Sequence, residues 1–359
     1  MIDLAALTKQ LVEIPSPTKN EKAVCDFIEN WIKEEVPGVP YSRTRNSLIV
    51  CPPQEAGKPV IGLFGHIDTV PADPDQPLGF KDGRLYGCGS SDMKSGDAVM
   101  MALLKDYEKL NANLVAVFYD GEEGPDEGNG MKDLMPSLPH LDFAIVLEPT
   151  NNAIMAGCMG GMHAIVTFEG ERAHSARPWQ GKNAIFRSLP VLTKLRDLPR
   201  RETVVSGLTF YEVMSPTMAS TRNAANVIPD NFEINVNIRF APNRTDAEAL
   251  DELKRLVGDL ASIRVRDISV PGKVCVSHPL MQEWIDKCSL KVEPKQAWTD
   301  LARLTANGIP AVNFGPGDPD RCHQAVEWME LANLEECYKL LTVLLTDICA
   351  KVTNIAPEI

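Results

Sequence analysis

Residues 115–124, VAVFYDGEEG, run an apolar segment directly into three acidic residues that fall within four positions. The apolar segment, 114–119, has the length and composition of a buried strand, since parallel strands covered on both faces are apolar throughout. Crowded carboxylates at the end of such a strand cost free energy unless a cation offsets their charge. The stretch therefore predicts a buried sheet with a metal-binding strand end.

Similar apolar runs flank this stretch on both sides. Residues 60–64 and 143–147 have the same strand-like character, residues 95–110 have a helical pattern, and residues 311–314 repeat the strand pattern late in the chain. Strands that alternate with helices are typical of α/β proteins with a parallel sheet. We expect a doubly wound, mixed but largely parallel sheet in the domain that carries the site.

The pattern changes in the middle of the chain. Residues 231–240 alternate apolar and polar side chains, the period of a strand with one solvated face, and Thr245 to Glu248 form a capping box that opens a helix. A chain of 359 residues usually forms more than one core. We predict a catalytic domain of residues 1–161 and 273–359, with a smaller α+β domain, 162–272, inserted into it.

Composition excludes several classes of protein. The formal net charge of −13 opposes a broad nucleic-acid-binding surface. The apolar runs are too short for a membrane span, and the N-terminal segment lacks the charge pattern of a secretory signal. Nine cysteines without a C-x-x-C pair indicate reduced thiols. We expect a cytoplasmic protein with neither nucleic acid nor membrane as a partner.

Several of the predicted strands end in residues that bind metals or transfer protons. Ligands of open α/β sheets bind beyond the carboxyl ends of the strands, so these residues should converge. Two histidines and several carboxylates suit a pair of divalent ions such as zinc, with one carboxylate shared. The strand-end candidates are His66, Asp68, Asp92, Glu122, Glu123, Glu148 and His323.

A pair of ions about 4 Å apart activates water at neutral pH and polarises a carbonyl, which suits hydrolysis of an amide. One glutamate must remain free of metal to take the proton from water and pass it to the leaving amine. The sequence therefore predicts a metal-dependent amidohydrolase with two Zn²⁺ ions, for which Co²⁺ could substitute.

Each candidate also has a purely structural interpretation. His66 alone could be a hydrogen-bonded core histidine, although its position at a strand end favours a functional role. Asp92 could only cap the helix that follows it, and His323 lies in a long predicted loop. Arg177 and Arg222 could bind substrate or form ordinary salt bridges, and the sequence leaves both alternatives open.

Ordered motifs along nearly the whole chain resemble a family of co-catalytic metallohydrolases. That family includes acetylornithine deacetylase, succinyl-diaminopimelate desuccinylase, aminoacylase and the glutamate carboxypeptidases. Each motif is weak alone, but their order is specific. The motifs are GHIDTVP, GCGSSDMKSG, DGEEG, LEP, AHSARPWQGKNAI, NVIPD, VNIRFAP and WTDLARLTANGIPAVNFGPGDP, followed by His323.

The resemblance implies a zinc-peptidase-like fold and a defined set of metal ligands. Asp92 is expected to bridge the two ions, of which one is also bound by His66 and Glu148 and the other by Glu123 and His323. The family further implies a cis peptide bond after the bridging aspartate.

The same resemblance assigns the remaining roles in the catalytic domain. Glu122 is expected to act as the general base. Asp68 is expected to lie behind the ring of His66, where it would orient the ring and raise its basicity.

The resemblance also assigns roles within the inserted domain, which it identifies as a lid and dimerisation domain. His174 is expected to stabilise the oxyanion, often in the site of a partner subunit, with help from Asn226. Arg239 is expected to bind a substrate carboxylate, to which its planar guanidinium is suited. The family thus implies a homodimer.

The motifs are most similar to the actinobacterial type of succinyl-diaminopimelate desuccinylase. This likeness implies hydrolysis of N-succinyl-L,L-2,6-diaminopimelate to succinate and L,L-diaminopimelate, for lysine and cell-wall synthesis. Residues 157–162 lack an arginine that other desuccinylases carry there, and Cys-His-Gln at 322–324 replaces Ala-His-Thr. Alternatives are an acetylornithine deacetylase or carboxypeptidase of the same family, or more remotely a protein that binds metal or ligand without turnover.

Overall fold

The computed structural model describes residues 2–351, which form two compact units. Of the described residues, unit 1 comprises 2–156, 275–293 and 307–351, and unit 2 comprises Gly157–Val274 and Pro294–Ala306. These segments differ from the predicted boundaries chiefly at 294–306, which join unit 2. The backbone N–H of Met159 donates to Ala297 in this added segment, at 3.3 Å.

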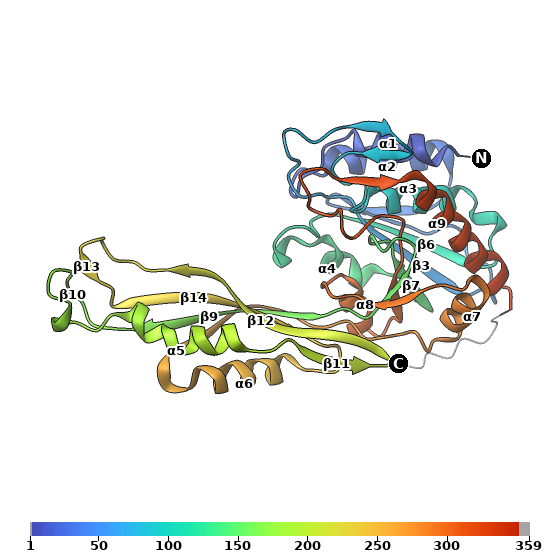
Figure 1. Cartoon of the computed structure of the whole chain (residues 1–359). Helices are drawn as coiled ribbons and strands as arrows, with labels where there is room; N and C mark the ends of the chain where they lie inside the picture. Colours follow the sequence, from blue (N-terminus) through green and yellow to red (C-terminus); the bar gives the residue numbers. More distant parts are fainter. Residues whose placement is uncertain (1, 352–359) are drawn as a thin grey trace. The chain divides into compact units, whose positions relative to one another are not determined.

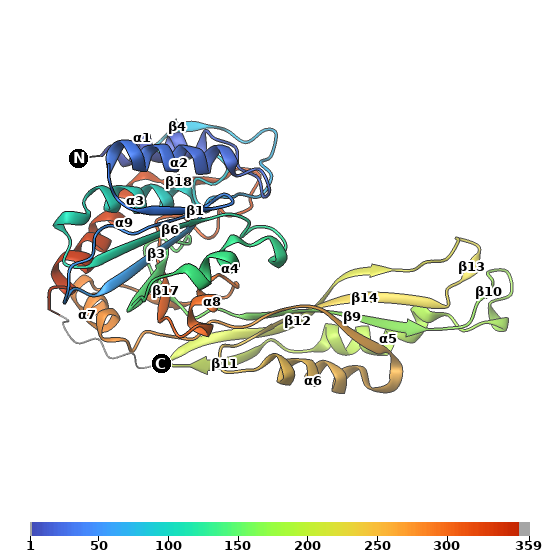
Figure 2. The ribbon, with the colours of Figure 1, turned by 180° about the vertical axis from the view of Figure 1, so that it is seen from behind.

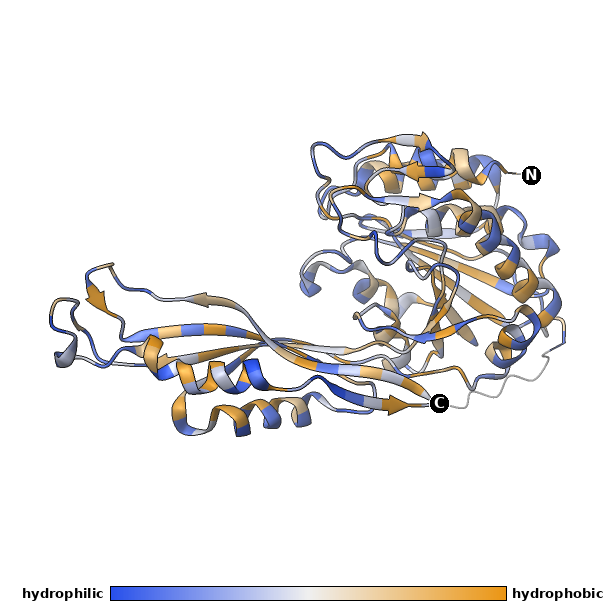
Figure 3. Ribbon diagram, in the orientation of Figure 1, coloured by the Kyte–Doolittle hydropathy of each residue, from blue (hydrophilic) through white to orange (hydrophobic). Residues whose placement is uncertain are grey.

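An eight-stranded mixed sheet forms the centre of unit 1. Its four central strands, β6, β3, β7 and β17, are parallel, whereas β1, β2 and β8 run antiparallel to their neighbours. The central strands are apolar and buried, which is why Figure 3 colours them mainly orange. In sheet order the strands are β1 Tyr41–Thr44, β2 Ser47–Val50, β6 Asn113–Tyr119, β3 Val60–His66, β7 Phe143–Val146, β17 Ala311–Asn313, β8 Ile154–Ala156 and β16 Val292–Pro294.

Helices cover both faces of this sheet, which confirms the predicted α/β class. On one side α3 packs against β3 and β6 and is itself covered by α1 and α9, while α4 lies on the other side (Figures 1 and 2). The predicted helix at 95–110 ends earlier, at Lys105. The helices of unit 1 are α1 Leu4–Val12, α2 Lys22–Glu35, α3 Lys94–Lys105, α4 Gly130–Leu134, α7 Pro279–Cys288 and α9 Leu331–Val343.

A small antiparallel sheet of unit 1 holds two chain segments that are far apart in the sequence. Its strands are β18 Trp328–Glu330, β5 Arg84–Tyr86 and β4 Gly79–Lys81, in that order. Trp328 pairs with Tyr86 across the sheet. This pairing fixes the chain after His323 beside the loop that leads to Asp92.

Unit 2 is an antiparallel sheet with two helices on one face. Apolar side chains of β14 alternate with polar ones, as predicted, and pack under α5 and α6 (Figure 3). The predicted capping box is present at the start of α6, where Thr245 and Glu248 bond each other's backbone N–H. The elements are β11 Arg201–Val205, β12 Leu208–Ser220, β14 Asn231–Phe240, β9 Gly160–Glu169, β15 Ser262–Ser269, α5 Ala184–Asp197, α6 Asp246–Val257, α8 Leu301–Ala306 and the short pair β10 Ala173–His174 and β13 Val227–Ile228.

Two further features concern the chain as a whole. Across residues 2–351, no helix is both long enough and apolar enough to cross a membrane. All nine cysteines are free thiols.

Candidate metal centre

The carboxyl ends of three parallel strands bring the predicted residues to one edge of the sheet. His66 is the last residue of β3 and pairs with Tyr119, the last residue of β6. The acids of DGEEG follow β6 directly. On the other side Phe64 pairs with Val146, the last residue of β7, and Glu148 follows two residues later. The parallel register therefore brings the carboxyl ends of these three strands to one edge of the sheet, as predicted.

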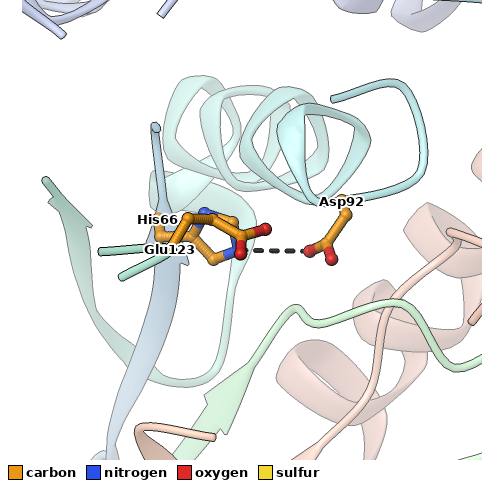
Figure 4. Close-up of side chains that lie close together, drawn as sticks. All are labelled: His66, Asp92 and Glu123. Atoms are coloured by element: carbon orange, nitrogen blue, oxygen red, sulfur yellow. Dashed lines mark hydrogen bonds and ion pairs between the residues drawn. The ribbon is translucent and has the colours of Figure 1, made fainter. Parts of the chain in front are cut away.

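Three side chains form a cluster that could hold a metal ion, and Figure 4 shows them pointing toward one another. They are His66 from β3, Asp92 from the turn before α3, and Glu123 from the turn after β6. One donor atom from each lies within 4.8 Å of the others. The Nε2 atom of His66 is 3.1 Å from a carboxylate oxygen of Asp92.

His323 joins this cluster from a segment 200 residues away from Glu123 in sequence. Its Nε2 atom lies 2.8 Å from Glu123 and 3.5 Å from Asp92, so Asp92 contacts both histidines. The residue adopts φ 59°, a left-handed conformation uncommon for a non-glycine residue. Its side chain is 54% exposed, whereas that of His66 is 1% exposed.

Asp68 anchors the acidic turn through its carboxylate. One carboxylate oxygen accepts the backbone N–H of Glu122 at 3.0 Å, and the other accepts the backbone N–H of Glu123 at 3.1 Å and the hydroxyl of Thr18. The Nδ1 atom of His66 lies 3.0 Å from the backbone carbonyl oxygen of Asp68 and 3.6 Å from its carboxylate. The main chain of Asp68 thus orients the ring, while its buried side chain fixes the turn that bears both glutamates.

The carboxylates strongly favour the charged form of both histidines. Burial opposes a charge on His66, but the hydrogen bond to Asp92 and the charges of Asp92, Glu122 and Asp68 raise its pKa well above the usual value. Hydrogen bonds to Asp92 and Glu123 raise the pKa of His323 to about 10. The site therefore has an excess of negative charge that bound cations would offset.

This donor set fits divalent metal ions. Imidazole nitrogens and carboxylate oxygens are the ligands that zinc and similar borderline ions prefer. Asp92 contacts both histidines, as a residue shared between two ions would. The peptide bond from Asp92 to Met93 is cis, which confirms that expectation.

We expect the metal-free protein to bind Zn²⁺ more tightly as the pH rises, and to release protons as it does so. His323, with a pKa of about 10, is protonated at neutral pH, and a metal ion must displace that proton. One displaced proton makes the apparent affinity rise about tenfold per pH unit below the pKa. Competition with a chromophoric chelator at several values of pH measures this slope. A Zn²⁺ affinity that decreases as the pH rises would contradict the prediction.

Glu148 lies just past the end of β7, where its side chain is buried with 5% of the residue exposed. A glutamate that precedes a proline could simply end a strand at the protein surface, but the burial of Glu148 excludes that role. Its assignment as the fifth ligand stays a prediction.

The structure also brings His174 and Asn226 together, in unit 2. They lie on or next to the short paired strands β10 and β13, and the backbone N–H of Ser175 donates to the carbonyl of Asn226 at 2.9 Å. Arg239 lies elsewhere in unit 2. It is eight residues from Asn231 along β14, or about 26 Å at the rise of a strand. Strand β10, which carries His174, lies beyond the start of β14 (Figure 1), so His174 cannot share a small substrate with Arg239 of the same chain.

Of the two interpretations of Arg222, a substrate contact or an ordinary salt bridge, the structure favours the salt bridge. Its guanidinium lies 3.0 Å from the carboxylate of Glu233, so it forms an ordinary and largely exposed ion pair. The backbone N–H of Arg177 donates to the carbonyl of His174 at 2.8 Å. For the side chain of Arg177, substrate binding and an ordinary salt bridge both remain open.

Sequence patterns missed one acidic residue at this site, Glu327. It is 2% exposed, and its carboxylate accepts backbone N–H groups of the loop that ends at Asp92. Burial raises its pKa to about 7, although these hydrogen bonds act in the opposite direction. The available signal was an acid flanked by Val326 and Trp328, an apolar setting in which a carboxylate needs partners.

Comparisons with known proteins give a consistent result. The model of the peptidase family M20/M25/M40 matches residues 62–347. The succinyl-diaminopimelate desuccinylase of Corynebacterium glutamicum is 36% identical over 357 residues, and the match covers 96% of each protein.

Two solved structures share the fold. The M20 family metallo-carboxypeptidase Sso-CP2 of Sulfolobus solfataricus matches with a TM-score of 0.80 at 15% identity, over 98% of this chain and 100% of that one. The YXEP protein of Bacillus subtilis, a dinuclear metal-binding peptidase of the M20 family, matches with a TM-score of 0.71 at 15% identity, over 97% and 98% of the two chains. At such identities the likeness concerns the fold.

Proposed function

Since the chain belongs to the peptidase family M20/M25/M40, as the family model and the full-length relative show, we propose that it hydrolyses N-succinyl-L,L-2,6-diaminopimelate to succinate and L,L-diaminopimelate. The family predicted from the motifs is thereby confirmed, and the chain is a metal-dependent amidohydrolase. The observation that carries the proposal is the cluster of His66, Asp92, Glu123 and His323 in a chain so similar to a desuccinylase.

We assign two metal ions to this cluster, zinc in the cell, with the protein in the cytoplasm. Asp92 would bridge the ions, His66 and Glu148 would hold one, and Glu123 and His323 the other. Two bound ions would lower the pKa of a water molecule and polarise the amide carbonyl. Both imidazoles must lose a proton before they can act as ligands.

Glu122 would take the proton from water and deliver it to the leaving amine. It follows β6 directly, and its backbone N–H is held by Asp68, whose other carboxylate oxygen holds Glu123. The proposed base and its neighbouring ligand are therefore fixed by one buried carboxylate. Such positioning is what proton transfer over hydrogen-bond distance requires.

Arg239 would bind a carboxylate of the substrate. It is partly buried, and burial lowers its pKa. Across residues 2–351 no carboxylate forms an ion pair with it, and its side chain lies on the face of β14 opposite to Ile238, away from the core under α5 and α6. A desolvated guanidinium without an acidic partner is suited to an anionic ligand.

The test of this function is release of free amine by the zinc-loaded protein. The panel contains N-succinyl-L,L-diaminopimelate, N-acetylornithine, and a set of N-acyl amino acids and dipeptides. We expect strong preference for the succinyl compound, and loss of activity on chelation. Preference for N-acetylornithine or a dipeptide would assign the chain to another activity of the family, and the missing arginine at 157–162 would then be a feature of specificity.

We also propose a homodimer in which His174 and Asn226 act in the site of the partner subunit. The separation of about 26 Å between the start of β14 and Arg239 supports this, because one chain cannot place both ends of unit 2 on one small substrate. Light scattering of the purified protein measures the oligomeric state.

Mixed dimers test the role of His174 directly. E122Q and H174A are each expected to be inactive alone, since one lacks the base and the other an oxyanion donor. In a hybrid, the H174A subunit supplies Glu122 and its E122Q partner supplies His174, so one site is complete. Random mixing at equal amounts should restore about a quarter of the wild-type activity, because half of the dimers have one of two sites intact. Mixing without any gain would show that His174 does not act across subunits.

A further inference from the structure

The carboxylate of Glu327 binds the loop that carries Asp92. One oxygen accepts the backbone N–H groups of Ser91 and Asp92, at 2.8 and 3.0 Å, and the other accepts that of Gly89 at 2.9 Å. These contacts span more than 230 residues of sequence. Three backbone donors of one short loop thus converge on a single buried side chain.

Glu327 is itself held from two directions. The side chain of Gln76 accepts the backbone N–H of Glu327 at 2.8 Å and donates to its carbonyl at 2.9 Å. The next residue, Trp328, begins β18, which pairs with β5 of the small sheet. The carboxylate therefore projects from a fixed segment of backbone.

Trp328 links the same segment to the loop of His323. Its ring lies under the guanidinium groups of Arg84, at 3.8 Å, and Arg321, at 4.7 Å. Its carbonyl accepts the hydroxyl of Ser91, which in turn accepts the backbone N–H of Asp318. Glu327 and Trp328 thus contact Ser91, next to Asp92, and Trp328 also contacts Arg321, close to His323.

We propose that Glu327 is a positioning residue of the metal centre, which holds the backbone of Asp92 so that its carboxylate can bridge two ions. The inference rests on the proposed two-metal site. Residues that orient metal ligands typically change metal affinity or activity 10- to 100-fold on substitution, about the size expected for this one. Glu327 is not among the three residues whose donor atoms cluster within 4.8 Å, and its two oxygens instead accept three backbone N–H groups.

A purely structural role for Glu327 makes a different prediction. If the carboxylate only stabilised the fold, its loss would lower the melting temperature and leave the folded protein with ordinary metal affinity. A positioning role requires that the folded variant bind metal more weakly and with altered ligand geometry.

The test compares three variants with the wild type. E327Q replaces one oxygen by an amide N–H₂, so at least one backbone donor loses its acceptor. Q76A keeps the carboxylate but removes the side chain that fixes its backbone. E330Q is the matched control, since Glu330 ends the same strand in a partly exposed ion pair with Arg84.

Metal affinity is measured by chelator competition, and ligand geometry by the visible spectrum of the Co²⁺-loaded protein, on samples shown to be folded by circular dichroism. We expect E327Q to weaken metal binding about 10- to 100-fold and to change the Co²⁺ spectrum. Q76A should shift both readouts in the same direction by less, and E330Q should stay within about twofold of the wild type.

Folded E327Q and Q76A with wild-type affinity and spectrum would overturn the inference and leave the proposed function intact. If E327Q fails to fold, Q76A decides between the same two results. A wild-type protein that binds no metal would instead overturn the proposed function itself, and the positioning role with it.

Discussion

Replacing Glu122 with glutamine is expected to lower kcat by about 10²- to 10⁴-fold, the usual contribution of a general acid–base residue. The amide cannot take a proton from water, although it has nearly the shape of the carboxylate. The backbone N–H of residue 122 still donates to Asp68, so the turn should keep its conformation. Steady-state kinetics and metal analysis of the same sample measure the two effects.

The metal content of E122Q shows whether its activity is lost with the general base or with the metal site. E122Q should retain both ions, because the donor atoms found within 4.8 Å of one another come from His66, Asp92 and Glu123. E127Q is the control, since Glu127 is an exposed acid of the same loop. An E122Q protein with near-wild-type kcat would remove Glu122 as the base, and one that lost a metal ion would make it a ligand.

Replacing Asp92 with alanine is expected to lower metal affinity by more than the 100-fold upper range of residues that only orient ligands. Asp92 contacts both imidazoles, at 3.1 and 3.5 Å, so its loss affects both proposed ions together. Hydrolysis should fall with metal occupancy. Atomic absorption after gel filtration gives the metal content per chain.

D75A provides the comparison for D92A, because Asp75 is an exposed aspartate in the segment between β3 and β4. It should bind two ions and hydrolyse substrate as the wild type does. If D92A kept one ion tightly bound and lost only the other, the two sites would be independent and Asp92 would not bridge them.

The strands and the residues at their ends could be predicted from sequence because their signals are local. The apolar run before His66 became β3, and the alternation along 231–240 became β14 with unchanged bounds. The rule that ligands bind beyond the carboxyl ends of parallel strands then placed His66 and Glu123 in one site. The roles of His174 and Arg239, in contrast, came from resemblance alone.

Contacts between distant segments could not be predicted in this way. Nothing near Glu327 in sequence indicates that its carboxylate binds the backbone at Asp92, 235 residues away. The role of Asp68 was only partly foreseen, since its main chain rather than its carboxylate lies at hydrogen-bond distance from the ring of His66. The assignment of residues 294–306 to the catalytic domain was wrong for a similar reason. The hydrogen bond from Met159 to Ala297 joins segments that are distant in sequence, and a local sequence pattern does not reveal it.

The insertion of unit 2 within unit 1 also sets the order in which the metal centre is completed during synthesis. Glu123 and His323 are 200 residues apart, so at about 5–20 residues per second the ribosome needs roughly 10–40 s to pass from one to the other. Throughout that interval the nascent chain carries the acidic turn without its second histidine and without Glu327. In the proposed two-metal site, capture of the full complement of metal would therefore be one of the last events in the maturation of this protein, after unit 2 has left the ribosome.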